Sequence, residues 1–262
     1  MILEKNWRIL TIGDGDLSFS NALQTTYGPA TLTATVYDSL EAMRDKYDDL
    51  FYQQLTENKI QVLFEFDVTA PKTWQGLTKH SFDLVIFQFP LLPGFKSLEE
   101  YKARCNGINV NTLNRALLRS FLVHSFAHFL DPKGQQLCFI TSKDVNPYRQ
   151  WNIENALHID TDIHYLGSSP FNIDNFPNYR VRNVDRDKHV KDTRGITYAW
   201  SLHKNHSLAK QLTPAMYQLN NCCSMCQVGP FINEVDRNKH NNSVKHKKMV
   251  EFEKLWAIKL SE

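Results

Sequence analysis

Hydrophobic and polar positions follow two alternating patterns over the first two thirds of the chain. Short runs of apolar and β-branched residues predict strands, and stretches with apolar residues three or four apart predict helices. The predicted strands are Arg8–Gly13, Thr31–Asp38, Ile60–Val68, Phe82–Phe89 and Gln136–Ser142. The predicted helices are Ser18–Thr26, a helix that begins after Ser39 and continues to Leu50, and Asn111–Leu130.

The order of these elements predicts an α/β fold. Strands that alternate with helices pair in parallel through right-handed crossovers, and this builds a doubly wound sheet. Beyond Ser142 the pattern is weaker, with a helix favoured over Tyr148–His158 and a late, alternating strand over Gly195–Leu202. A boundary near Leu208–Pro214 divides the chain into a larger domain over residues 1–207 and a small domain over residues 215–262.

Composition narrows the class of protein without naming a partner. Hydrophobic residues make up 42% of the 262 residues, enough for a sizeable core, which excludes global disorder. The net charge of +2 neither favours nor excludes nucleic acid. The N-terminal segment is no secretory signal, and no apolar stretch reaches the length of a membrane span. We therefore expect a cytoplasmic protein with no membrane part, nucleolar if the organism is eukaryotic. The sequence leaves the oligomeric state open.

A glycine-rich turn, Gly13-Asp14-Gly15-Asp16, joins the first strand to the first helix. Glycines let the backbone approach a ligand closely, and the helix beyond offers free N–H groups. A dinucleotide fingerprint requires a third glycine at position 18, where this chain has Ser18. The turn therefore favours a ligand with less negative charge than a pyrophosphate.

Two carboxylates follow the second and third predicted strands. Asp38 lies at a distance from the turn that suits a residue binding ribose hydroxyls, and Asp67 ends the next strand. Each feature alone has an ordinary structural explanation, since a glycine turn can be purely structural and a strand-end Asp more often caps its loop. Ligands of open α/β sheets bind beyond the carboxyl ends of the strands. Three such features in register therefore favour a ligand site at that edge.

Several motifs resemble one family in order and spacing. The segment Ile9–Ala22, ILTIGDGDLSFSNA, resembles the glycine-rich signature of the fungal ribosomal RNA uridine-N3 methyltransferase family, which reads GEGNFSFS. ATVYDS, FDVT, FDLVIFQFP, Trp151 and FPNYRVR follow in the family's order, so the resemblance covers roughly residues 8–200.

The resemblance implies a Rossmann-like methyltransferase sheet, S-adenosylmethionine as cofactor and ribosomal RNA as partner. It places Gly13, Asp14 and Gly15 along the methionine part of the cofactor, with Ser18 in the same set. By the same resemblance, Asp38 binds the ribose hydroxyls and Asp67 lies near the adenine.

The fourth strand departs from the family's motif. The family's strand ends in Asn-Phe-Pro-His, and this chain has Gln88-Phe89-Pro90-Leu91. The amide of Gln88 keeps a donor and an acceptor that suit a base edge, so we interpret Gln88 and Pro90 as the catalytic positions. Leu91 cannot take the proton that uridine N3 must lose. A different target base, absent activity, or a mere strand end are the alternatives.

The C-terminal segment contains a pattern typical of zinc sites. Cys223-x2-Cys226 is followed by His240-x5-His246, and zinc prefers four tetrahedral N and S ligands. The segment resembles the single zinc finger of U1 small nuclear ribonucleoprotein and matrin-like proteins, although its Cys-to-His gap of 13 residues is one longer. Cys222 leaves the first ligand open, with Cys223 better spaced. Chance spacing is the alternative.

Basic residues suggest where RNA binds. Lys245, Lys247 and Lys248 lie in a run from position 237 to 248 that contains five Lys or Arg and no acid. Such a run is usually a solvated face, but beside a finger it suits phosphate contacts. We expect these lysines, with Arg180 and Arg182, to hold the RNA backbone. An apolar stripe after the finger predicts a helix that packs back on the main domain; it consists of Met249, Phe252, Leu255 and Trp256.

Together these features predict an α/β protein in which a doubly wound Rossmann-like methyltransferase sheet carries a small C-terminal zinc finger. Its predicted function is S-adenosylmethionine-dependent methylation of a ribosomal RNA base. The alternative is a non-catalytic zinc-finger RNA-binding protein built on a degenerate methyltransferase scaffold.

Overall fold

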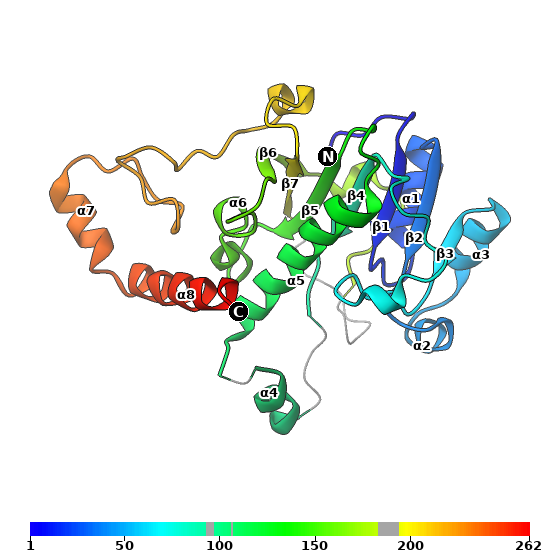
Figure 1. Cartoon of the computed structure of the whole chain (residues 1–262), viewed down its shortest axis with the longest axis horizontal. Helices are drawn as coiled ribbons and strands as arrows, with labels where there is room; N and C mark the ends of the chain where they lie inside the picture. The colour runs from blue at the N-terminus through cyan, green and yellow to red at the C-terminus, as the bar shows by residue number, and fades with distance from the viewer. Residues whose placement is uncertain (93–96, 106, 183–193) are drawn as a thin grey trace.

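Seven strands form one mixed sheet in the computed structural model, which describes residues 1–92, 97–105, 107–182 and 194–262 (Figure 1). The sheet order is β3-β2-β1-β4-β5-β7-β6. β7 is antiparallel to both of its neighbours, and the remaining pairs are parallel. The strands are β1 Arg8–Ile12, β2 Thr31–Thr35, β3 Gln61–Leu63, β4 Leu84–Gln88, β5 Leu137–Lys143, β6 His164–Phe171 and β7 Gly195–Ser201.

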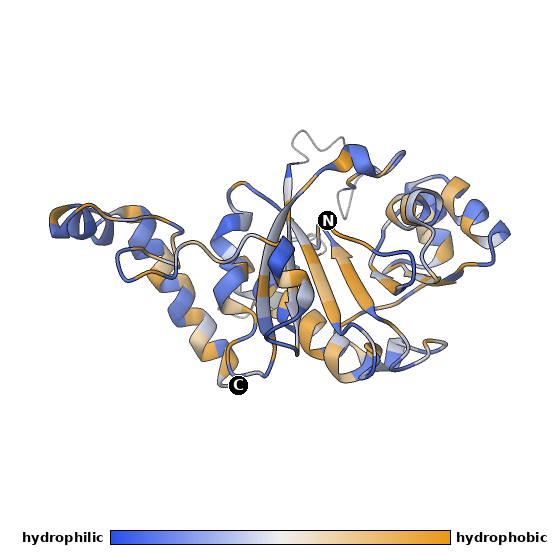
Figure 2. Ribbon diagram, turned by 90° about the horizontal axis from the view of Figure 1, so that it is seen from above, coloured by the Kyte–Doolittle hydropathy of each residue, from blue (hydrophilic) through white to orange (hydrophobic). Residues whose placement is uncertain are grey.

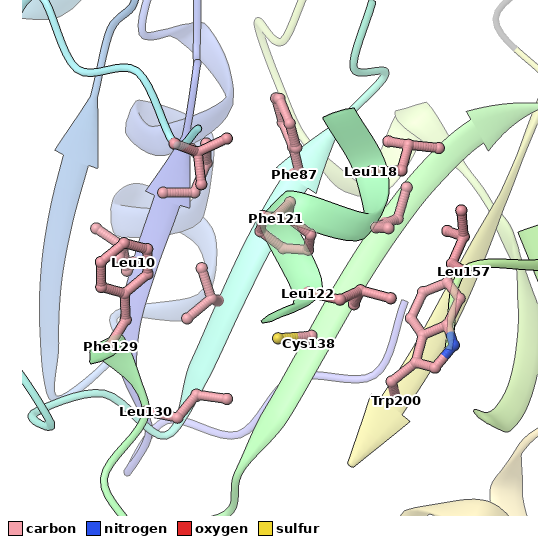
Figure 3. Close-up of a cluster of buried hydrophobic side chains, with 14 of the residues drawn as sticks. Leu10, Phe87, Leu118, Phe121, Leu122, Phe129, Leu130, Cys138, Leu157 and Trp200 are labelled. Atoms are coloured by element: carbon pink, nitrogen blue, oxygen red, sulfur yellow. The ribbon is translucent and has the colours of Figure 1, made fainter. Parts of the chain in front are cut away.

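Helices cover both faces of this sheet, so the doubly wound prediction is confirmed. Successive strand residues point to opposite faces, and Ile9 and Leu10 of β1 are both fully buried, in separate apolar clusters. Helix α1 (Ser18–Tyr27) packs on one face. Helix α5 (Val110–His124) packs on the other, where its Phe121 meets the cluster that contains Leu10 (Figure 3).

The sequence pattern predicted the bounds of the first helix well but missed a break in the second predicted helix. Helix α1 ends at Gly28, which adopts φ 54° as a C-terminal cap. The single helix predicted after Ser39 is instead two, α2 Leu40–Lys46 and α3 Leu50–Glu57. The chain leaves the helical conformation at Tyr47, which is extended, and the side chain of Asp48 accepts a hydrogen bond from the backbone N–H of Leu50, where α3 begins. Leu50 is consequently 50% exposed instead of buried.

The region after β5 is where the sequence pattern failed. The segment predicted as a helix over Tyr148–His158 forms a 3-10 turn, Tyr148–Trp151, and the short α6, Ile153–Ala156. Strand β6 was not predicted, because its sequence HYLGSSPF does not alternate and it is irregular at Gly167. The remaining helical segments are α4 Leu98–Cys105, α7 Glu234–Asn241, α8 Val244–Leu260, a π turn at Ser125–Phe129 and 3-10 turns at Pro71–Thr73, Ile173–Asn175 and Ser207–Gln211.

The C-terminal helix α8 lies against α5, although α7 projects away from the sheet (Figure 1). The indole of Trp256 donates a hydrogen bond to the carbonyl of Ala156 at 2.9 Å, and Met249 is also buried, so the predicted packing of the apolar stripe is confirmed for these two residues. The segment near the predicted boundary stays with the sheet, because Thr213 and Ser168 exchange backbone hydrogen bonds of 2.8 Å. In Figure 2 hydrophobic residues concentrate in the sheet, and the projecting α7 is mostly hydrophilic. Among the described residues, no helix combines the length and apolar character that crossing a bilayer requires.

Candidate active site

A cavity of about 280 Å³ opens at the carboxyl ends of the parallel strands. Open α/β sheets bind their ligands at this edge. The loops after β1, β2, β3 and β4 all contribute to its wall, together with the segment before residue 183. The lining includes Gly13, Asp14, Gly15, Asp16, Asp38, Lys46, Tyr47, Asp67, Gln88, Phe89, Pro90, Leu91, Tyr179, Arg180 and Arg182.

The first glycine of the turn is required by both conformation and space. Gly13 adopts φ 62°, a left-handed conformation that favours glycine. A Cβ atom at this position would lie 3.1 Å from Cε2 of Phe87. Its backbone N–H donates a hydrogen bond to the hydroxyl of Thr35 at 3.1 Å, which ties the turn to β2. The backbone of the turn is therefore held at the cavity wall without a side chain in the way.

Two aspartates in the turn play different parts. The carboxylate of Asp14 accepts a hydrogen bond from the N–H of Ser20 at 2.6 Å, at the start of α1. Burial, together with the nearby charge of Asp16, raises the pKa of Asp14 to about 7. Asp16 accepts hydrogen bonds from both the hydroxyl and the N–H of Ser18. Ser18 is fully buried and is not among the residues that line the cavity, so its contacts support the turn.

The carboxylates of the next two loops both reach the cavity. β2 ends at Thr35 and β3 at Leu63, earlier than predicted, so Asp38 and Asp67 lie in loops. Asp38 is held by Lys46, whose ammonium lies 2.8 and 2.9 Å from its two oxygens. Asp67 accepts hydrogen bonds from the N–H and hydroxyl of Thr69, so it also caps its own loop. A carboxylate has about four lone-pair positions, which leaves Asp38 acceptor capacity for a ligand.

The end of β4 presents an unpaired amide to this cavity. Both polar atoms of the Gln88 side chain are buried, and neither has a hydrogen-bond partner among the described residues. Leaving such an amide unpaired costs about 1–3 kcal/mol for each buried group. Phe89 follows with φ 45°, and Pro90 and Leu91 complete this part of the wall. The chain therefore keeps a donor and an acceptor here that no described residue satisfies and that a ligand or water can satisfy.

The two arginines differ in position. Arg182 binds Asp16 at 2.5 Å, its guanidinium lies 5.0 Å from the ring centroid of Tyr47, and its side chain is only 17% exposed. Arg182 therefore lies in the wall of the cavity, and its contact with RNA stays a prediction. Arg180 is exposed at the rim. Burial raises the pKa of Tyr179 well above its usual range, so this phenol stays protonated beside the cavity.

Asp16, Lys46 and Tyr47 are site residues that sequence reasoning did not include. Asp16 belongs to the recognised turn, so its position was a usable signal. Lys46 lies eight residues after Asp38 in the last turn of α2, and no sequence motif connects the two.

A second group of side chains has the composition of a metal site. One ligand atom from each of Cys223, Cys226, His240 and His246 lies within 4.8 Å of the others. The Nδ1 atom of His246 is 3.7 Å from Sγ of Cys223, 3.6 Å from Sγ of Cys226 and 3.0 Å from Nε2 of His240. Bond lengths of a tetrahedral zinc give an S to N separation of about 3.5 Å. The four residues therefore could hold a metal ion such as zinc, and Cys222 lies outside the group.

The basic run beside this group is partly exposed. Lys245, Lys247 and Lys248 are exposed in the first turns of α8. Arg237 instead donates a hydrogen bond to the carbonyl of Asn220 at 2.6 Å and lies over the ring of Phe231. The exposed cations of this run are therefore Lys239, Lys245, Lys247 and Lys248, whereas Arg237 is half-buried.

The sheet order, the glycine turn at the first strand end and the cavity beside it define a Rossmann-like methyltransferase. Residues 10–183 match the family BMT5-like, described as rRNA (uridine-N3-)-methyltransferase BTM5-like. The chain belongs to this family.

Two proteins of Arabidopsis thaliana are similar in sequence. An uncharacterized protein is 27% identical over 175 residues, which cover 66% of this chain and 79% of that protein. Heavy metal-associated isoprenylated plant protein 41 is 27% identical over 183 residues, which cover 69% of this chain but only 33% of that protein.

Two solved structures are weakly similar to this chain. A predicted O-methyltransferase from Agrobacterium tumefaciens is 14% identical with a TM-score of 0.44, over 77% of this chain and 76% of that chain. TYW2 from M. jannaschii, solved in complex with AdoMet, is 13% identical with a TM-score of 0.40, over 76% and 71% of the two chains.

Proposed function

We propose that this protein transfers a methyl group from S-adenosylmethionine to N3 of a uridine in ribosomal RNA. Membership of the BMT5-like family supports the reaction. The observation that carries the assignment of the site is the buried, unpaired amide of Gln88 in the wall of the cavity. The N–H group of this amide can donate a hydrogen bond to a carbonyl oxygen of uracil, which orients the base and leaves N3 open toward the methyl group. Such a protein acts where ribosomal RNA is made or used, in the nucleolus or the cytoplasm.

The residues of the strand ends fit the cofactor. Gly13 and Gly15 leave their backbone open toward the methionine part, and Asp38 has acceptor capacity for the ribose hydroxyls. Asp67, on the next loop, lies on the side of the adenine. When it is bound, S-adenosylmethionine supplies an electrophilic methyl group on a sulfonium. Asp14, Asp38 and Asp67 line the cavity that receives this cation. Lys46 offsets the charge of Asp38, and Asp14 is only partly ionised near pH 7 because its pKa is raised to about 7.

The target base must reach the cavity outside a helical stack, so it is extruded or single-stranded. Gln88 and Pro90 then hold its edge and its face at the end of β4. Arg180, exposed at the rim, contacts the RNA backbone, while Arg182 keeps the wall closed through Asp16.

Calorimetry and a methyl-transfer assay test this function. Wild-type protein should bind S-adenosylmethionine and methylate total RNA from a strain that lacks the gene. Asp38→Ala should weaken cofactor binding, because it removes the acceptor of the ribose hydroxyls. Gln88→Ala should leave cofactor binding intact and lower transfer about 100-fold, within the range of a lost transition-state hydrogen bond. Gln53→Ala, on the exposed surface of α3, is the matched control. Wild-type protein that binds no cofactor at millimolar concentration would overturn the proposal.

The C-terminal segment has its own proposed role. The Cys223, Cys226, His240 and His246 group binds one zinc ion, which orders the finger, and the exposed Lys245, Lys247 and Lys248 contact RNA phosphates.

A non-catalytic RNA-binding protein remains the second candidate because Leu91 offers no proton acceptor beside Gln88. Tight RNA binding, with cofactor bound and no methyl transferred to any RNA, would select this second candidate.

A further inference from the structure

A small recess adjoins the cavity on the far side of Pro90. Its volume is about 20 Å³, and it shares the wall from Phe89 to Leu91, together with Val181 and Arg182, with the main cavity. This volume accommodates one water-sized group, such as a single oxygen atom. The remaining wall consists of Ser142, Lys143 and Tyr148, none of which reaches the main cavity.

Ser142 provides an unsatisfied donor in this recess. It follows Thr141 in β5, next to the strand end that carries Gln88. The residue is only 2% exposed, and its hydroxyl is buried without a hydrogen-bond partner among the described residues. A buried hydroxyl is ordinarily paired, so this one indicates an absent acceptor.

Among the described residues, the charged side chains that line the recess are Lys143 and Arg182, and both are cationic. The ammonium of Lys143 lies 5.5 Å from the ring centroid of Tyr148. Burial raises the pKa of Tyr148, so its phenol stays protonated and can donate. The neighbouring carboxylate of Asp144 is bound to Arg149 at 2.6 Å, which reduces its effect on Lys143.

A second acid among the described residues near the recess is also paired with a cation. Asp16 is bound to Arg182, whose guanidinium borders both the recess and the cavity. Among the described lining residues there is no carboxylate, so the recess combines hydrogen-bond donors with positive charge.

We propose that the recess binds a carbonyl oxygen of the target base and stabilises the base as its N3-deprotonated anion, so that no general base is required. This inference rests on the proposed function. The N3 proton leaves to water, and its electron pair spreads over N3 and the carbonyl oxygens. The N3 electron pair then forms a bond to the methyl carbon while the carbon–sulfur bond breaks. The base becomes neutral and the sulfonium is left as a thioether. A site that acts in this way tolerates Leu91 in place of a proton acceptor.

The pH dependence of methyl transfer tests the proposal. Lys143→Met should lower the rate about tenfold near pH 7, because a rise of one unit in the pKa of the uridine N3–H makes the anion ten times rarer. The deficit should vanish at high pH, where the imide ionises without help. Lys143→Arg should restore most of the rate, and Ser142→Ala should act in the same direction as Lys143→Met. Lys204→Met, an exposed change after β7, is the control. A deficit that is equal at every pH, or no deficit, would overturn the proposal.

A binding measurement separates this proposal from the function on which it rests. The fluorine NMR signal of 5-fluorouridine, titrated with pH beside S-adenosylhomocysteine and the full chain, reports the ionisation of N3. Binding should make N3 about tenfold more acidic, and Lys143→Met should remove the shift. If binding makes N3 more acidic in this way while no RNA is methylated, the recess proposal is supported and the proposed methyl transfer is refuted. If RNA is methylated but the bound nucleoside ionises as in water, or no nucleoside binds at millimolar concentration, the recess proposal fails alone.

Discussion

The docking of α8 on the methyltransferase sheet depends on a buried charge. Arg115 of α5 has no exposed side-chain surface, and its Nη2 atom lies 2.9 Å from Oε1 of Glu253 on α8. The same nitrogen donates to the carbonyl of Gln150, while Nε and Nη1 have no partner among the described residues. Glu253→Ala would leave this guanidinium buried without its carboxylate. Asn152, whose amide is 3.1 Å from the same oxygen, would also lose its acceptor.

Removing one partner of a buried ion pair costs about 3–5 kcal/mol. Glu253 is 27% exposed, so water partly replaces the carboxylate, and we expect the lower end, about 3 kcal/mol. Glu253→Gln keeps an acceptor oxygen for Arg115 and Asn152, and should cost about 1 kcal/mol. The free energy of unfolding is measured by urea titration, followed by tryptophan fluorescence, to which all five tryptophans contribute, including Trp256 of α8.

Glu251→Ala is the matched control, because this carboxylate lies on the exposed side of the same helix and should change stability by less than about 0.5 kcal/mol. If Glu253→Ala costs no more than Glu251→Ala, the ion pair does not hold α8 on α5, and our account of the interface is wrong. A loss confined to protease resistance of α8, with unchanged global unfolding, would instead show that the helix docks as a separate unit.

Three further predictions concern zinc, a buried carboxylate and RNA. Purified protein should contain about one zinc per chain, and Cys226→Ser should release it and open the finger to protease; a zinc-free, protease-resistant wild type would contradict this. The pKa of Asp14 is about 7 in the folded protein and 3.8 in the unfolded chain. The stability that its protonated form contributes is therefore fully present below pH 3.8 and is lost as the pH rises to 7. The free energy of unfolding of the wild type should therefore fall by up to about 4 kcal/mol relative to that of Asp14→Asn between these pH values. Parallel pH profiles of the two proteins in urea titrations would show that Asp14 does not cause this loss. Changing Lys245, Lys247 and Lys248 together to Ala should weaken RNA binding for all sequences and reduce the log–log salt slope by about 0.7–0.9 for each lost contact. An unchanged slope in filter binding would show that these lysines do not touch phosphate.

Local sequence determined the parts of this protein whose signals are local. Strand β4 was predictable because a strand buried on both faces must be apolar at nearly every position. The turn at Gly13 and the cap at Gly28 were predictable because both adopt positive φ, which favours glycine. Asp38 and Gln88 could be assigned to one edge because the carboxyl ends of parallel strands meet there.

Tertiary structure alone decided the contacts that complete the site. The pair of Asp16 and Arg182 joins positions 166 residues apart, and that of Arg115 and Glu253 joins positions 138 apart. Nothing in the local sequence around either partner identifies the other, because charged side chains choose partners by position in space. The same holds for Ser142, which is an ordinary strand residue in the sequence. It becomes a buried donor without a partner among the described residues only because Pro90 and Val181, which are distant in the sequence, lie with it around one small recess at the end of β5.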